Sequence, residues 1–169
     1  MKHLLIVDDE EGGRESLKAI FCKTHRVSAV VGAREAEQVL AGERIDLILL
    51  DNIMPDKDGV TFLAEARDLY PDIPIIMVSG SRAVRPALEA LRGGAFEYLT
   101  KPYDVEEIRR VVDLALERNA LHRRVEALQG DLSREFPVDH IVGRSEALRQ
   151  AMENIRKAAE TDSTVLISG

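Results

Sequence analysis

The chain is 169 residues long, 45% of its residues are hydrophobic, and its formal net charge at pH 7 is -7. This length allows one ordinary domain with an appendage, and the apolar share allows a sizeable core. The acidic balance argues against nonspecific binding to nucleic acid or to an anionic membrane surface. No apolar run approaches the length of a transmembrane helix, and the first residues do not resemble a signal peptide. We therefore expect a cytoplasmic chain with no membrane partner.

The single cysteine, Cys22, fits the same compartment. One cysteine cannot form an internal disulfide, which agrees with a reducing environment. Its place within an apolar helical pattern predicts a small core residue, and a reactive thiol is the less favoured alternative.

Short apolar runs alternate with helix-like stretches from the N-terminus onward. The runs occupy residues 4–7, 26–31, 46–50, 73–79 and 96–100. The helix-like stretches occupy residues 13–24, 33–42, 59–70, 84–92 and 104 onward. This alternation predicts an α/β fold with a doubly wound parallel sheet, and continuous apolar runs indicate strands buried on both faces. In such sheets ligands bind beyond the carboxyl ends of the strands.

The fifth helix carries a second apolar periodicity, with spacings of three and four residues. Its members are Val111, Leu114, Arg118, Leu121, Val125, Leu128 and Leu132. Leucine at each d position and valine at a positions are typical of a short, parallel, two-stranded coiled coil. We therefore expect the helix to continue unbroken, with residues 106–133 forming a dimerising linker. The alternative is one amphipathic helix packed on its own domain.

The last part of the chain, residues 138–169, has a different organisation. A turn is followed by a predicted helix from about Ser145, as its N-cap, to about residue 159. An apolar, strand-like segment then leads to Gly169.

Polar side chains follow four of the predicted strands. Asp8 and Asp9 follow the first, Asp51 the third, Ser79 the fourth and Lys101 the fifth. Parallel strands would bring these groups to one edge of the sheet. Three carboxylates there repel one another unless a cation joins them, and carboxylate oxygens with waters suit Mg²⁺.

Asp51 is the candidate nucleophile at this edge, because a carboxylate can form an aspartyl-phosphate. A metal, the Lys101 ammonium and the Ser79 hydroxyl around it would form a cradle for a phosphoryl group. Each group taken singly is as easily an ordinary loop residue. Their occurrence together at successive strand ends favours a functional site.

Four stretches carry a resemblance to a known family: "LLIVDDE" (4–10), "DLILLDNIMPDKDG" (46–59), "IIMVSGS" (75–81) and "AFEYLTKP" (95–102). They resemble the receiver domain of bacterial two-component response regulators, over residues 1–119. The resemblance implies a flavodoxin-like (βα)5 receiver with sheet order 2-1-3-4-5. It also implies that Asp51 accepts a phosphoryl group from a sensor histidine kinase.

The resemblance assigns roles to the neighbouring residues as well. It implies that Asp8, Asp9, Asp51 and the backbone carbonyl of Ile53 bind Mg²⁺, and that Lys101 contacts the phosphoryl oxygens. Ser79 and Tyr98 would form the switch pair, in which the hydroxyl moves to the phosphate and the ring follows inward. Ile53 and Ser81 occupy positions that tune self-dephosphorylation. The Ile53 side chain cannot hydrogen-bond a water, so we predict a long-lived phosphoryl-aspartate.

Residues 138–169 resemble the opening of the AAA+ ATPase domain of sigma-54-dependent transcription activators. The whole chain then resembles the regulatory segment of an NtrC-like response regulator: receiver, linker and AAA+ fragment. The phosphate-loop lysine is not among these residues, so we expect a signalling domain and not an enzyme. The resemblance implies that the full-length protein binds ATP, promoter-upstream DNA and sigma-54 RNA polymerase.

Two other functions fit parts of this pattern. A Mg²⁺-dependent phosphohydrolase also places an aspartate nucleophile at a strand end, but it requires a second acid two residues on, where this chain has Ile53. A degenerate receiver could act only as a dimerisation module. The intact set of Asp8, Asp9, Asp51, Ser79 and Lys101 argues against that alternative.

Overall fold

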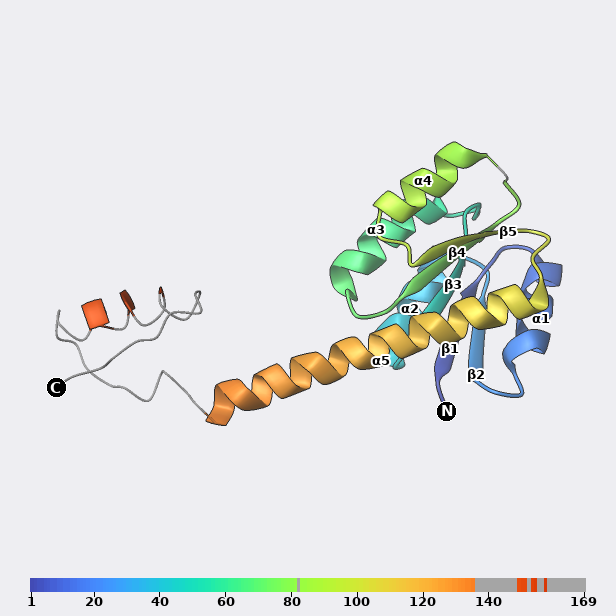
Figure 1. The fold of residues 1–169 in the computed structure, drawn as a ribbon. Coiled ribbons are helices and arrows are strands. Elements are labelled where there is room, and N and C mark those ends of the chain that lie inside the picture. Colours follow the sequence, from blue (N-terminus) through green and yellow to red (C-terminus); the bar gives the residue numbers. More distant parts are fainter. Residues whose placement is uncertain (82, 136–148, 152, 155–156, 158–169) are drawn as a thin grey trace. The chain divides into compact units, whose positions relative to one another are not determined.

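The computed structural model describes residues 1–81, 83–135, 149–151, 153–154 and 157. Strands and helices alternate along the first of these ranges and into the second (Figure 1). The elements are β1 His3–Val7, α1 Glu11–Phe21, β2 Arg26–Val30, α2 Ala33–Gly42, β3 Leu47–Asp51, α3 Gly59–Leu69, β4 Ile75–Ser79, α4 Val84–Arg92, β5 Glu97–Thr100 and α5 Val105–Glu135. Each coincides with a predicted element, and the bounds differ by a few residues at the ends.

The five strands form one parallel sheet in the order β2-β1-β3-β4-β5. The predicted flavodoxin-like order is therefore confirmed. Val7 pairs with Leu50, and Leu50 pairs with Met77, so the central strands end almost level with one another. Because β1 and β3 are neighbours, the residues that follow Val7 and Leu50 emerge together at the carboxyl edge of the sheet.

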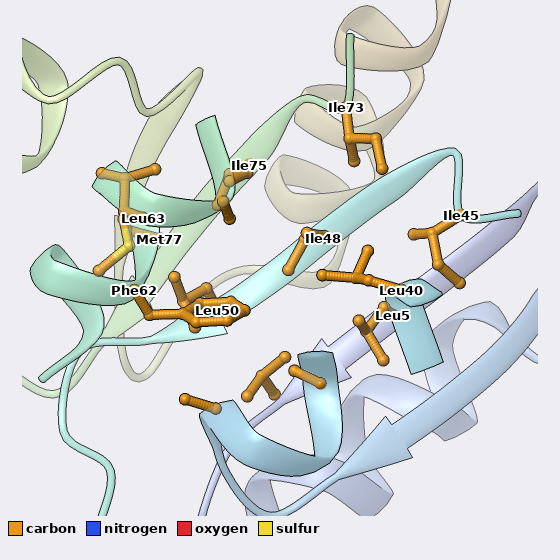
Figure 2. Close-up of a cluster of buried hydrophobic side chains, with 14 of the residues drawn as sticks. Leu5, Leu40, Ile45, Ile48, Leu50, Phe62, Leu63, Ile73, Ile75 and Met77 are labelled. Atoms are coloured by element: carbon orange, nitrogen blue, oxygen red, sulfur yellow. The ribbon is translucent and has the colours of Figure 1, made fainter. Parts of the chain in front are cut away.

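Helices cover the two faces of the sheet (Figure 1), and an apolar layer lies between the helices and the strands on each face. Successive strand residues alternate between these two layers: Leu5 belongs to one cluster, and Leu4 and Ile6 belong to the other. The first cluster, drawn in Figure 2, packs the strands against α2, α3 and α4. The second packs them against α1 and α5. Burying one such aliphatic side chain contributes about 1.5–3 kcal/mol, so the sheet is a rigid platform for its edge.

Helix α5 is continuous over 31 residues, as the sequence predicted. Ile108, Val112 and Ala115 are buried against the sheet. Val111, the first residue of the predicted seam, also lies in this core and is 5% exposed. Its β-branched side chain packs on the sheet because it lies on the same face of α5 as Ile108 and Ala115. The exposed part of the seam therefore begins at Leu114.

Three further seam residues are exposed, with values of 52% for Leu114, 58% for Leu121 and 51% for Val125. The side chains of Leu128 and Leu132 lie outside the described residues. Ser145, Gly169 and most of the helix and strand predicted over 138–169 also lie outside the described residues. Within that range the structure describes residues 149–151, 153–154 and 157, and these are helical. The chain divides into two units, Met1–Ala127 and Leu128–Gly169.

The prediction for Cys22 is wrong. Helix α1 ends at Phe21, and Cys22 is its exposed C-cap residue. The last core residue of this helix is Phe21, because the following residue already turns away from the sheet. Within the part of the chain that the structure describes, no helix combines the length and apolar character needed to span a bilayer.

Candidate functional site

The carboxyl edge of the sheet brings together two buried acids and one lysine. Asp8 is 1% exposed and Asp51 is 6% exposed. The Lys101 Nζ donates to Asp8 Oδ2 at 2.8 Å and to Asp51 Oδ2 at 3.2 Å. The backbone N–H of Lys101 donates to the Ser79 carbonyl at 2.7 Å, which fixes the start of this side chain beside β4. Three strands that are distant in sequence thus meet in one ionic cluster.

A third acid, Asp9, lies beside this pair and is exposed. One carboxylate oxygen from each of Asp8, Asp9 and Asp51 lies within 4.8 Å of the other two. Oxygen atoms so arranged, with room for water on the exposed side, are the donor set that Mg²⁺ prefers. The residues present therefore fit a divalent cation.

The negative charge of the cluster exceeds its positive charge. Burial raises the pKa of Asp51, and the Asp8 charge raises it further, while Lys101 only partly offsets these effects. For Lys101, burial acts to lower the pKa, but the hydrogen bond to Asp8 and the charges of Asp51 and Asp8 outweigh it. The pKa of Lys101 is therefore raised well above its ordinary value. One lysine serves two buried carboxylates, so a second cation would be attracted to the site.

Two residues that were not predicted from the sequence support Asp8. Arg14 binds its backbone, and Gly13 leaves room for its side chain. Arg14 Nη1 donates to the carbonyl of Asp8 at 2.8 Å and to that of Asp9 at 2.9 Å. A Cβ at Gly13 would collide with Asp8 Oδ2, so only glycine leaves room for this carboxylate. The sequence does contain a signal for this close approach, namely the pair of glycines in the first turn of α1. Glycine is a poor helix former, so its presence there needs another reason.

Glycine also permits the turn after Asp51. A Cβ at Gly59 would collide with the Asp51 carbonyl and would lie 2.8 Å from the Asn52 Cα. The Gly59 N–H donates to the Asn52 carbonyl at 2.9 Å, which closes the loop between β3 and α3. This close approach keeps Asp51 at the base of a short, tight loop.

The two predicted switch residues lie beside the cluster and share a neighbour. The Ser79 side chain is fully buried, and its Oγ accepts a hydrogen bond from the Ser81 N–H at 3.2 Å. The Tyr98 hydroxyl donates to the Ser81 carbonyl at 3.2 Å, and its partly buried ring packs against the first apolar cluster. Both side chains therefore contact the backbone of Ser81, at the start of the loop that leads to α4.

Comparison with known proteins identifies this arrangement. The sequence profile of the response regulator receiver domain matches residues 4–113. The chain belongs to the response regulator receiver family. Regulatory protein AtoC of Escherichia coli is 33% identical over 100% of this chain and 37% of its own length. DNA-binding transcriptional regulator NtrC of Azospirillum brasilense is 31% identical over 98% of this chain and 34% of its own length.

These matches confirm the resemblance of the chain to NtrC-like response regulators. Response regulator protein FleR of Pseudomonas aeruginosa is 38% identical over 98% of this chain and 33% of its own length. The chain thus spans about a third of the length of these relatives.

Solved structures agree with the receiver fold. NtrX from Brucella abortus, in complex with ADP, has a TM-score of 0.74 and 28% identity over 96% of this chain and 35% of that one. A CheY-like receiver domain protein from Methanospirillum hungatei has a TM-score of 0.68 and 28% identity over 72% of this chain and 98% of that one.

The two residues that follow the buried Asp51 in this receiver, Asn52 and Ile53, are uncharged. The Asn52 N–H donates to Asp51 Oδ1 at 2.7 Å, but the Asn52 Oδ1 is buried and has no hydrogen-bond partner among the residues that the structure describes. The Ile53 side chain is 66% exposed at the rim of the site. An exposed aliphatic side chain contributes little to the stability of the fold.

A cavity of about 520 Å³ lies at the other edge of the receiver sheet, where the strands begin. Its walls come from α5, including Arg118 and Leu121, and from the segments around Pro71 and Phe96. The Arg118 guanidinium lies 5.8 Å from the Phe96 ring centroid, within the range of a cation–π contact. This cavity is thus separate from the acid cluster, which lies at the opposite ends of the strands.

Proposed function

We propose that this segment accepts a phosphoryl group from a sensor histidine kinase on Asp51, and that it controls a sigma-54-dependent transcription activator in response. As a receiver of the response regulator family, it is a signalling domain. The observation that carries the finer proposal is the buried, lysine-bridged pair of Asp8 and Asp51 with Asp9 beside them.

The arrangement of these groups supports a direct transfer of the phosphoryl group. An Asp51 carboxylate oxygen attacks the phosphorus of the donor phosphohistidine. The P–N bond breaks as the new P–O bond forms, and the imidazole nitrogen keeps the electron pair and takes up a proton. Asp8, Asp9, Asp51 and the Ile53 carbonyl would hold Mg²⁺. When bound, Mg²⁺ would neutralise the charge of the phosphoryl oxygens.

Lys101 and Ser79 would then hold the product. Lys101 already bridges two carboxylates, so it can turn from Asp51 to a phosphoryl oxygen without leaving Asp8. The buried Ser79 Oγ only accepts from the Ser81 N–H, so its proton is available to a phosphoryl oxygen. Movement of Ser79 would disturb Ser81, to which Tyr98 is also hydrogen-bonded. We propose that this linkage carries the switch to α4 and α5.

The direct test is labelling with a small phosphodonor in the presence of Mg²⁺, followed by intact-mass spectrometry. The wild-type chain should gain one phosphoryl group, and Asp51→Asn should gain none. Asp58→Asn is the matched control, because Asp58 is an exposed acid of the same loop. Labelling of Asp51→Asn to the wild-type extent would exclude Asp51 as the acceptor.

The lifetime of the product tests the role of Ile53. An exposed aliphatic side chain cannot orient an attacking water, so we propose slow self-dephosphorylation. Ile53→Asn supplies a hydrogen-bonding group at the same place and should shorten the phosphoryl lifetime. Decay of the wild-type phosphoprotein within seconds would contradict the proposal.

We also propose that α5 forms the dimer and transmits the signal to an AAA+ domain. The exposed residues Leu114, Leu121 and Val125 support this, and Leu128 and Leu132 would extend the seam. Sedimentation should show a dimer at micromolar concentration, and Leu121→Asp should convert it to a monomer. Leu69→Asp, on exposed Leu69 of α3, is the control and should remain a dimer.

The other partners belong to the longer protein. The relatives are about three times as long as the matched region. We propose that ATP, promoter-upstream DNA and sigma-54 RNA polymerase bind outside these 169 residues, in the cytoplasm. A chain that dimerises but takes no label would instead indicate a degenerate receiver used only for dimerisation.

A further inference from the structure

The loop that follows Asp51 is attached to the start of α2 by an acid, Asp56. One carboxylate oxygen of Asp56 accepts the N–H of Ala33 at 3.1 Å, and the other accepts the N–H of Arg34 at 2.9 Å. These N–H groups belong to the first turn of α2 and have no partner within the helix. Asp56 therefore caps a helix that begins 23 residues earlier in the chain.

Gly32 provides the space for this contact. It is the N-cap residue of α2 and has no side chain with which to cap the helix. Its φ of -161° and ψ of -177° are extended and open to any residue, so conformation does not require glycine here. A Cβ at Gly32 would instead lie 2.6 Å from Asp56 Oδ1 and 2.9 Å from its Cγ. Glycine and aspartate thus form a fitted pair.

The other side-chain contacts of this loop are weaker or do not reach the start of α2. The ion pair of Lys57 with Glu37 of α2 is exposed, and exposed pairs contribute little. Asp56 is exposed as well, but it accepts two backbone N–H groups at the start of the helix. Asp58 is the N-cap residue of α3 but makes no side-chain cap hydrogen bond. The two bonds of Asp56 are charge-assisted, and the N–H of Arg34 is the main cause of its lowered pKa. Asp56 is thus ionised throughout the neutral range.

We propose that Asp56 is a positioning residue for the Mg²⁺ site, and that Gly32 allows it to act. By anchoring the middle of the loop to α2, it fixes the segment between Asp51 and Gly59. Ile53, whose carbonyl would bind the metal, lies in that segment. The inference rests on the proposed function of Asp51 and adds a determinant on a different helix.

The experiment measures Mg²⁺ affinity by calorimetric titration of the whole chain. Asp56→Ala removes the anchor, and Gly32→Ala displaces it from the other side. Both should raise the Kd for Mg²⁺ about tenfold, the lower end of the range for residues that support metal ligands. Asp56→Asn keeps one acceptor oxygen and should show a smaller increase. The controls Asp58→Ala and Gly42→Ala should stay within about twofold, because a Cβ at Gly42 meets nothing within 4 Å.

Stability is measured separately by urea unfolding, so that loss of the helix cap is not mistaken for loss of the metal site. Asp56→Asn, the mildest change, keeps the test informative where Asp56→Ala folds poorly. Lower stability with wild-type Mg²⁺ affinity in all three variants would overturn the inference and leave Asp56 as a structural cap. Absence of Mg²⁺ binding by the wild-type chain would overturn the proposed function together with it. If the wild-type chain is phosphorylated at Asp51 and the variants keep wild-type Mg²⁺ affinity, this inference is overturned and the proposed function is not.

Discussion

The two ends of β3 each carry a buried aspartate paired with a lysine, and the two aspartates behave in opposite ways. Asp46, just before the strand, accepts Lys2 Nζ at 2.9 Å and the His3 N–H at 2.9 Å. Burial acts to raise its pKa, but these hydrogen bonds outweigh burial and lower it. Asp51, the last residue of the strand, has a raised pKa, because of burial and the nearby Asp8.

The difference lies in whether the lysine is shared, because each carboxylate also accepts one backbone N–H, from His3 for Asp46 and from Asn52 for Asp51. Asp46 has its own lysine and a backbone N–H, so its negative charge is satisfied within the fold. Asp51 shares Lys101 with Asp8, and its remaining charge is not balanced. A satisfied acid stabilises the fold, whereas an under-compensated acid is ready to bind a cation or react with an electrophile.

The largest expected contrast is in the response to Mg²⁺. At about 100 times its Kd, a ligand of the folded state alone stabilises a protein by about 2.7 kcal/mol. We expect this gain, measured by urea unfolding, for the wild-type chain and for Asp46→Asn. Asp51→Asn should lose most of it. An equal gain in all three proteins would show that the carboxyl edge is not the metal site.

The next contrast concerns the two lysines. Lys101→Met removes the charged hydrogen bonds of two buried carboxylates, and should lower the free energy of unfolding by about 2 kcal/mol. The Lys2 side chain is 47% exposed, so Lys2→Met should cost less than about 1 kcal/mol. Urea unfolding without divalent cations measures both. Similar losses would mean that the two ion pairs are equivalent after all.

A smaller contrast is that removing the charge of each aspartate should change the stability of the fold in opposite directions. Without divalent cations, Asp51→Asn removes a buried charge that repels Asp8, and should stabilise the fold by about 1 kcal/mol. Asp46→Asn replaces an acceptor oxygen with a donor that faces another donor, and should destabilise the fold by about 1 kcal/mol. Differential scanning calorimetry would show the melting temperatures moving in opposite directions. Destabilisation by Asp51→Asn would show that Lys101 already compensates it fully.

The sequence was sufficient for the sheet and for the edge at which the acids meet. Continuous apolar runs fixed the strands, and parallel topology then placed Asp8, Asp51 and Lys101 together without knowledge of any side-chain contact. Cys22 was misjudged because helical periodicity does not show where a helix ends. Val111 fits the predicted seam and the core equally well by spacing, and only packing against the sheet decides between them.

Contacts between a helix start and a loop could not be predicted in this way. Arg14 binds the backbone of Asp8 and Asp9, and Asp56 fits against Gly32, but neither pairing has a periodic signal. Both depend on the relative positions of a helix start and a loop, which the strand order alone does not determine. Gly13 and Gly32, both beside helix starts, mark these close approaches, whereas a Cβ at the neighbouring Gly12 would meet nothing within 4 Å.

The smallest expected contrast is the dependence of stability on pH. The raised pKa of Asp51 means that the folded state binds its proton more tightly than the unfolded chain does. Its contribution to stability is therefore lost as pH rises from the ordinary value of 3.8 through the raised pKa. The lowered pKa of Asp46 has the opposite sign, and its contribution is lost only as pH falls below 3.8. As pH rises from about 4 to about 6, wild type should therefore lose stability relative to Asp51→Asn, which has no carboxyl group at this position. The stability difference between wild type and Asp46→Asn should be nearly flat above about pH 5, because Asp46 is already ionised there. Parallel profiles for the two variants would mean that both ends of β3 hold ordinary structural acids.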